Sequence, residues 1–194
     1  MILASRKLVP NPVVLDSCVI FPLYLRDTLF RAAEVGLYQA KWSEEILDGA
    51  TRNLVNQGRM TIEKAARFEA VLKQAFPESL AEVPDDLIVQ MTNDPRDRHV
   101  VATAVVTDAK IIVTFNLKDF PVDALAPWGI QALHPDVFLN RLYEDAPEIV
   151  ADLIQQQAED LQNPPLTIED LLTRLKLQVP VFADKMKCYF QDFN

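Results

Sequence analysis

The sequence predicts an α/β domain built around a parallel sheet, followed by a helical extension. Two short apolar runs rich in β-branched residues, 13–15 and 111–114, have the length and composition of buried parallel strands. Segments with apolar residues at helical spacing separate such runs, and this alternation is typical of a parallel sheet with helices on both faces. From Pro147 onward the apolar spacing is only helical. We therefore divide the chain into a domain over 11–144 and an extension over 145–194.

The elements of the domain follow from local patterns. The predicted strands are 13–15, 37–42, 80–83, 111–114 and 130–133. The predicted helices are 21–35, 43–56, 61–76 and 98–108. Ser43 is a suitable N-cap because its hydroxyl can accept a backbone hydrogen bond, and Glu44 and Glu45 then lie where the helix dipole favours anions. Pro95 suits the first helical position ahead of Arg98, where its missing N–H costs nothing.

The extension contains three apolar stripes at helical spacing. They are Ile149, Val150, Leu153 and Ile154; Leu171, Leu172 and Leu175; and Phe182, Met186 and Phe190. Prolines 164, 165 and 180 separate the three helices. These stripes could cover the core of the domain, form a homodimer face, or receive a partner protein, and packing on the domain is the first expectation.

Composition excludes several classes of protein. The chain has 194 residues, of which 49% are apolar and 24% charged, so wholesale disorder is excluded. Its 28 acidic and 19 basic residues give a net charge of -9, which argues against a broad basic face for nucleic acid or anionic lipid. No apolar run is long enough to span a membrane. A site that handles phosphate through a metal ion remains compatible with this charge.

The cysteines and glycines narrow the choice further. Cys18 and Cys188 lie near opposite ends of the chain, so no disulfide framework is expected and a reducing compartment, the cytoplasm, is predicted. The first ten residues lack the apolar region of a secretory signal. The four glycines form neither of the common glycine-rich phosphate loops.

Carboxylates gather where the predicted strands end. Asp16 directly follows the first strand, while Asn116 and Asp119 follow the fourth. Asp94 and Asp97 precede the helix that leads into the fourth strand, so we expect them at the same edge of the sheet. Crowded carboxylates repel one another unless a cation is present, and oxygen ligands suit Mg²⁺ or Mn²⁺. The chain has only two histidines, so serine–histidine or cysteine–histidine catalysis competes poorly.

Each carboxylate also has an ordinary structural interpretation. Asp94 could be a helix N-cap, Asp97 an acid of the first helical turn, and Asp119 a turn residue. Asp16 is the hardest to explain in this way, because an acid at the end of a buried strand must find a partner. His99 is expected to pack or form a hydrogen bond, not to catalyse. The argument for a site therefore depends on the set of residues together.

Three segments resemble the PIN-domain nucleases, a superfamily that includes the VapC-type toxins of bacterial toxin–antitoxin pairs. They are 13–17 (VVLDS), 94–104 (DPRDRHVVATA) and 114–120 (TFNLKDF), and the resemblance covers about residues 11 to 140. It implies a three-layer fold with sheet order 3-2-1-4-5, and Mg²⁺- or Mn²⁺-dependent cleavage of RNA by an activated water. It also implies a small antitoxin as partner. The helical tail looks like the extension found in one branch of bacterial PIN proteins.

The resemblance also implies roles for individual residues. Asp16 matches the first metal-binding acid of the family and Asp97 the later one. Asp94, Asn116 and Asp119 match supporting acidic or amide positions.

One position departs from the family pattern. The family usually has a glutamate where this chain has Gly49, and glycine supplies no ligand. Glu45 lies one turn earlier on nearly the same helix face, and Asp48 is adjacent, so either could lend a carboxylate. The alternative is a catalytically weakened PIN-like module that binds RNA or a protein.

The leading hypothesis is a metal-dependent endoribonuclease, a toxin held inactive by a small antitoxin. Arg52, Arg96 and Lys118 are predicted to steer the phosphate backbone, although basic residues on helix faces are often simply solvated. A third possibility is a phosphotransfer or phosphatase domain with Asp16 as nucleophile. It is disfavoured because a dehalogenase-like phosphatase would have a second acid where this chain has Cys18.

Overall fold

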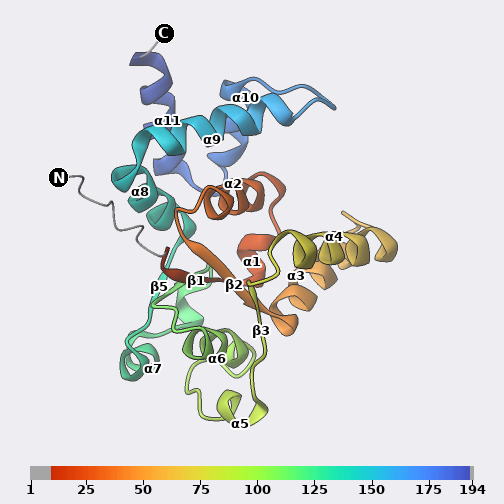
Figure 1. Cartoon of the computed structure of the whole chain (residues 1–194), viewed down its shortest axis with the longest axis vertical. Helices are drawn as coiled ribbons and strands as arrows, with labels where there is room; N and C mark the ends of the chain where they lie inside the picture. Colours follow the sequence, from red (N-terminus) through yellow and green to blue (C-terminus); the bar gives the residue numbers. More distant parts are fainter. Residues whose placement is uncertain (1–9, 193–194) are drawn as a thin grey trace, which may run out of the picture.

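A computed structural model describes residues 10–192 and has the predicted architecture (Figure 1). The strands are β1 (Pro12–Leu15), β2 (Gln39–Ser43), β3 (Leu80–Ala81), β4 (Ile111–Val113) and β5 (Gln131–Leu133). All pair in parallel in the order β3-β2-β1-β4-β5, which confirms the order 3-2-1-4-5. The strand order reverses at β1, and ligands of open parallel sheets bind at such a switch point. The residue that follows β1 is Asp16.

Helices cover the sheet and continue beyond it. Those of the domain are α1 (Ser17–Ile20), α2 (Leu23–Glu34), α3 (Glu44–Asn56), α4 (Ile62–Ala75), α5 (Asp85–Ile88), α6 (Arg98–Val106) and α7 (Val122–Leu125), with 3₁₀ turns η1 (Leu117–Asp119) and η2 (Ala126–Trp128). The later ones are α8 (Pro135–Asp145), α9 (Pro147–Asp160), α10 (Ile168–Leu175) and α11 (Pro180–Asp192). The helices predicted over 21–35, 43–56, 61–76 and 98–108 are confirmed as α2, α3, α4 and α6. Each observed end lies within two residues of its predicted position.

Capping explains where the helices begin. Ser43 is confirmed as an N-cap, since its Oγ accepts a hydrogen bond from the N–H of Ile46 at 3.4 Å. The prediction for Pro95 was wrong. The helix begins at Arg98, because the Asp94 carboxylate accepts the N–H of Arg96 and fixes a separate turn there.

The end of the same helix was also predicted too late. Helix α6 ends at Val106, two residues before the predicted end. Asp108 has φ +54°, a left-handed backbone conformation in which an α-helix cannot continue.

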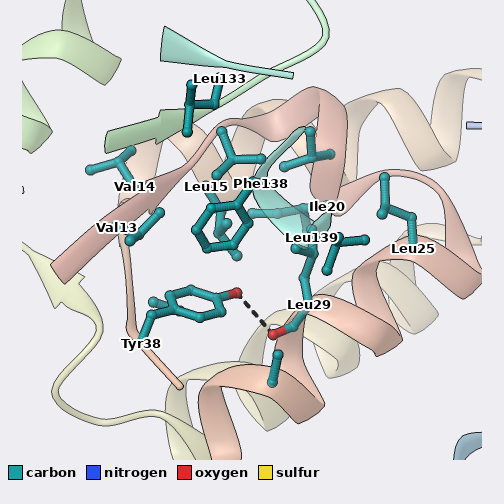
Figure 2. Packing of buried hydrophobic residues seen from close by; sticks show 14 of the residues in the cluster. Val13, Val14, Leu15, Ile20, Leu25, Leu29, Tyr38, Leu133, Phe138 and Leu139 are labelled. Carbon is teal, nitrogen blue, oxygen red and sulfur yellow. Dashed lines mark hydrogen bonds between the residues drawn. The ribbon is translucent and has the colours of Figure 1, made fainter. Parts of the chain in front are cut away.

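The hydrophobic core is centred on β1, and residues from later elements such as α8 pack against it. Val14 and Leu15 are fully buried. Figure 2 shows Phe138 from α8 near Leu15 and Tyr38, and the Tyr38 hydroxyl donating to the backbone oxygen of Leu29 at 2.8 Å. Burial raises the pKa of Tyr38, so this hydroxyl stays protonated and remains a donor.

The extension packs on the domain through α2. Gln157 on α9 is fully buried; its Oε1 accepts from the Thr28 hydroxyl at 2.7 Å and its Nε2 donates to the Tyr24 carbonyl at 2.9 Å. Most of the three predicted stripes are buried, namely Val150, Leu153, Ile154, Leu171, Leu172, Leu175, Phe182 and Met186. The stripes therefore cover the domain, as first expected. Figure 1 shows α9 and α10 beside α2.

Within residues 10–192, no helix is both long and apolar enough to cross a membrane.

Candidate active site

Asp16 is held rigidly at the carboxyl end of β1. It is 2% exposed, and its N–H donates to the Val113 carbonyl of the neighbouring strand at 3.1 Å. Its Oδ2 accepts from the Thr114 hydroxyl at 2.6 Å and from the Cys18 thiol at 3.1 Å. Its Oδ1 accepts one long bond from Ser17, 3.3 Å. One carboxylate oxygen is therefore fixed by the protein, while the other retains capacity for a further ligand.

Two neighbours of Asp16 act only as donors to it. Burial, followed by the charge of Asp16, raises the pKa of Cys18 to about 12, so this residue stays a thiol at neutral pH. Thr114 is fully buried, and its hydroxyl also accepts the N–H of Asn116 at 3.0 Å. Sequence reasoning missed this role of Thr114. The available signal was a polar residue that ends an otherwise apolar run.

Asp97 lies near the other predicted acids. Burial first, and then the charges of Asp16, Asp119 and Asp94 in that order, raise its pKa to about 6, while Arg96 opposes them. It is the N-cap residue of α6, yet its side chain accepts no capping hydrogen bond from that helix. Asp97 is therefore a half-buried carboxyl in the field of three other carboxylates and uncommitted to the helix.

The supporting residues come from two segments that meet, the loop before α6 and the 3₁₀ turn η1. The Asp94 carboxylate accepts from Arg96 N and Nε at 3.0 and 3.1 Å, and these bonds lower its pKa. The N–H of Asp94 donates to the carbonyl of Asp119 at 3.3 Å. The N–H of Asp119 in turn donates to the carbonyl of Asn116 at 2.9 Å. The structure thus brings these three positions together, as predicted, with Asp94 stabilising a turn.

Position 49 has little room for a side chain. A Cβ built on Gly49 would lie 3.2 Å from the Cβ of Ser17, which directly follows Asp16. Helix α3 therefore approaches α1 closely at this point. Glu45, one turn earlier, has its Oε1 3.7 Å from Nδ1 of His99. The pKa of His99 is lowered by burial, while Glu45 and Asp16 oppose this effect, so all three side chains lie in one neighbourhood.

The remaining predicted residues divide between two places. Asp48 and Arg52 are exposed and line a groove between α3 and α4. Arg96 binds Asp94, and the charge of Lys118 helps to lower the Asp94 pKa. Arg96 and Lys118 are thus at the carboxylates, whereas Arg52 faces another surface.

Carboxylate oxygens are the ligands that a divalent cation such as Mg²⁺ prefers. Among the described residues, no three His, Cys, Asp or Glu side chains are grouped closely enough to hold a metal ion by themselves. Mg²⁺ commonly binds through one or two carboxylates and keeps several waters, so a pair of acids is sufficient. Asp16 and Asp97 fit this requirement, because the charge of Asp16 helps to raise the pKa of Asp97 and one oxygen of Asp16 is lightly occupied.

A sheet of order 3-2-1-4-5 with acids after β1 and before α6 has the architecture expected of a PIN domain. The PIN domain family matches residues 12–118, which is more than half of the sequence. The chain therefore belongs to the PIN-domain family. Its extension is matched by a second family, described as the VapC50 C-terminal domain, over residues 135–188. This match begins at α8, and the predicted boundary between 144 and 145 stays a prediction.

A protein described as "Putative ribonuclease VapC50" from Mycobacterium tuberculosis (strain ATCC 25618 / H37Rv) is 48% identical over 109 residues. The aligned region covers 55% of this chain and 63% of that relative, so less than two thirds of the relative's length is spanned. No solved structure matches the chain.

Proposed function

We propose that this protein is a metal-dependent endoribonuclease of the VapC toxin type. The observation that carries the proposal is the half-buried position of Asp97 in the field of Asp16, since burial first and the charge of Asp16 second raise the pKa of Asp97. Family membership and the ribonuclease name of the relative support it. Asp16 and Asp97 would hold Mg²⁺ or Mn²⁺. When bound there, such an ion would supply Lewis acidity toward water and the phosphate oxygens.

The protein's own contribution is to orient these ligands. Thr114 fixes one oxygen of Asp16, so that carboxylate needs no reorganisation on binding. Asp94 before α6, together with Asn116 and Asp119 at η1, would supply further acceptors to position water. Arg96 and Lys118, beside Asp94, would attract the phosphate backbone into a site that is otherwise negative.

We propose Glu45, not Asp48, as the carboxylate that compensates for Gly49. Glu45 lies against His99 in the neighbourhood of Asp16, whereas Asp48 faces the groove between α3 and α4. Glu45 is 59% exposed and so is free to change rotamer toward a ligand.

The biological context is part of the same proposal. The substrate would be cellular RNA, the partner a small antitoxin protein, and the compartment the cytoplasm. A homodimer stays a prediction, since most of the apolar stripes that could have formed its face are used inside the chain.

The test is Mn²⁺-dependent cleavage of a mixed pool of structured RNA. We expect cleavage by the wild type, a loss of at least about 100-fold in Asp97→Asn and Glu45→Gln, and little change in Asp48→Asn. Asp152→Asn on the exposed face of α9 is the matched control. Full activity of the Asp97→Asn protein would overturn the proposal, because a metal ligand cannot be removed without a large loss.

A second candidate is a PIN-like module that binds RNA or protein without cleaving. It is motivated by Gly49, which supplies no acid and lies so close to Ser17 that a side chain there would be crowded. Calorimetry separates the two functions: the nuclease should bind Mn²⁺ stoichiometrically and lose that binding in Asp97→Asn, whereas the module should not bind it.

A further inference from the structure

Arg26 on α2 is a buried charge without a carboxylate partner. It is 7% exposed, and it forms no ion pair with any described side chain. Its Nη1 donates one long hydrogen bond, 3.4 Å, to the carbonyl of Phe21, and its guanidinium stacks 4.5 Å from the ring centre of Phe68. Buried arginines are nearly always paired with an anion, so this arrangement is incomplete.

The incomplete pairing is confirmed by the neighbours of Arg26. Asp27, the acid next to it in sequence, pairs with Arg31 at 3.2 Å. Burial lowers the pKa of Arg26, opposed by Asp27, so its charge is poorly compensated. None of its nitrogens is both buried and unbonded, so those without a hydrogen bond reach solvent. An external anion can therefore approach them.

The N-terminus of α2 adds positive potential at the same place. Its N-cap residue is Pro22, which provides no side-chain cap, and its first turn contains no acid. The bond from Arg26 to Phe21 holds the guanidinium beside this terminus. Helix N-termini of this length bind anions through free N–H groups and the helix dipole.

Two more arginines surround this terminus. The Arg59 guanidinium lies 4.8 Å from the ring centre of Phe21. Arg174 from α10 lies 5.0 Å from the ring centre of Tyr24 and donates to its hydroxyl at 2.8 Å. Both are exposed and form no ion pair within residues 10–192, although the charge of Arg174 also acts on Asp170. We call Arg26, Arg59 and Arg174 the arginine patch.

The patch is close to the candidate active site. Asp16 directly precedes α1 and Phe21 directly follows it. These two residues are therefore about 8 Å apart along the axis of this short helix. The carboxylates at one end repel phosphate, while the arginines at the other attract it. A strand of RNA that reaches Asp16 can therefore be held next to the cleavage point by its backbone.

We propose that the arginine patch and the N-terminus of α2 bind backbone phosphates of RNA beside the cleavage site. This inference rests on the proposed function, and it gives the extension a role, since Arg174 comes from α10. Guanidinium groups stacked on rings are already oriented and can bind phosphate with two parallel hydrogen bonds. Contacts to backbone phosphates do not depend on the base sequence. They therefore determine the affinity and the register of the bound RNA, and not a preference for particular bases.

The experiment measures binding without cleavage. Fluorescence anisotropy with a labelled ten-nucleotide single-stranded RNA of mixed sequence is recorded in EDTA over a range of salt concentrations, with a gel to show that the RNA stays intact. We compare the wild type with Arg59→Gln, Arg174→Gln and Arg26→Gln. Arg141→Gln on α8, an exposed arginine that bonds only Gln131, is the matched control.

We expect Arg59→Gln and Arg174→Gln each to weaken binding by about tenfold and to reduce the salt slope by about 0.7, the value for one phosphate contact on a single strand. Arg141→Gln should leave both unchanged. Because Arg26→Gln can affect folding, its result counts only alongside an unchanged circular dichroism spectrum. Equal binding by the patch variants and the wild type would overturn the inference.

A labelled polyglutamate peptide provides the opposing arm. If the patch variants lose affinity for this peptide but not for RNA, the patch receives an acidic protein segment and the RNA inference is wrong. The nuclease proposal fails separately: RNA bound at the patch but not cleaved in Mn²⁺ would leave this inference intact. RNA that is cleaved in Mn²⁺ but bound equally well by the wild type and the patch variants would leave the nuclease proposal intact and overturn this inference.

Discussion

At the scale of single residues, Asp97 is destabilising in the metal-free protein. Its pKa of about 6 lies above its ordinary value of 3.8, so the folded protein takes up a proton more readily than the unfolded chain. The protonated Asp97 therefore contributes to the stability of the fold at low pH, and this contribution is lost as the pH rises through the window from about 4 to 6.

We therefore expect Asp97→Asn to raise the melting temperature of the metal-free protein at pH 7.5. After allowance for solvent screening the gain is on the order of 1 kcal/mol, or about 2–4 °C. The gain should disappear below about pH 3, where Asp97 is protonated in both the folded and the unfolded state. Differential scanning calorimetry at the two pH values measures this, and an equal gain at both would show that ionisation of the half-buried Asp97 is not the cause.

Gly49 is explained at the same scale by its contact with Ser17. We expect Gly49→Ala to destabilise the fold by about 1 kcal/mol, because crowding outweighs the higher helix propensity of alanine. The measurement is urea denaturation. A family-like Gly49→Glu change should suffer the same crowding, which moves Ser17 and with it Asp16.

The control is a double-mutant cycle with Ser17→Gly, which removes the Cβ that Gly49 approaches. The pair should be more stable than the sum of the single changes predicts. Stabilisation by Gly49→Ala alone would contradict the account of crowding.

At the scale of elements, Asp136 joins the domain to the last helix. It is 7% exposed, and its carboxylate accepts the N–H groups of Val181 and Phe182 at 3.0 and 2.8 Å, so a residue of α8 caps α11. The fully buried Phe182 is positioned by this cap.

We expect Asp136→Ala to cost about 2–3 kcal/mol, since two charge-assisted bonds are lost and two buried N–H groups are left unpaired. The melting temperature should fall by about 4–10 °C, and amide hydrogens of α11 should exchange faster than those of β1. Asp152→Asn on the exposed face of α9 serves as control. Unchanged exchange in α11 would mean that the cap contributes little.

At the scale of the whole molecule, the domain and the extension share a core. Helices α9 and α10 pack on α2, and Gln157 satisfies backbone and hydroxyl groups of that helix from across the interface. The division at residue 144 therefore passes between segments that bury each other's apolar surface.

A chain that ends at Glu144 should consequently lose cooperative unfolding and bind the dye ANS, because the face of α2 beneath the extension becomes exposed. Calorimetry and ANS fluorescence of the truncated and full-length proteins provide the comparison. A truncated protein that is monomeric and unfolds cooperatively would instead support two independent domains with the boundary at 144.

The sequence by itself determined the order and type of the main elements and the acids at the sheet edge. These features depend on local rules: buried strands are short and β-branched, helices repeat every 3.6 residues, and polar residues end strands. Asp16 and Asp97 could be proposed from position alone. The sheet order came from family resemblance, because local patterns do not specify which strands pair.

Only the tertiary structure decided the contacts between distant residues. Thr114 bonds Asp16 across 98 positions of sequence, Gly49 lies against Ser17, and Arg26 is buried without an anion. Burial and electrostatic pairing depend on which surfaces meet, and a one-dimensional pattern does not contain that information. For the same physical reason, our proposal of Glu45 over Asp48, and the use of the helical stripes within the chain, required the packed molecule.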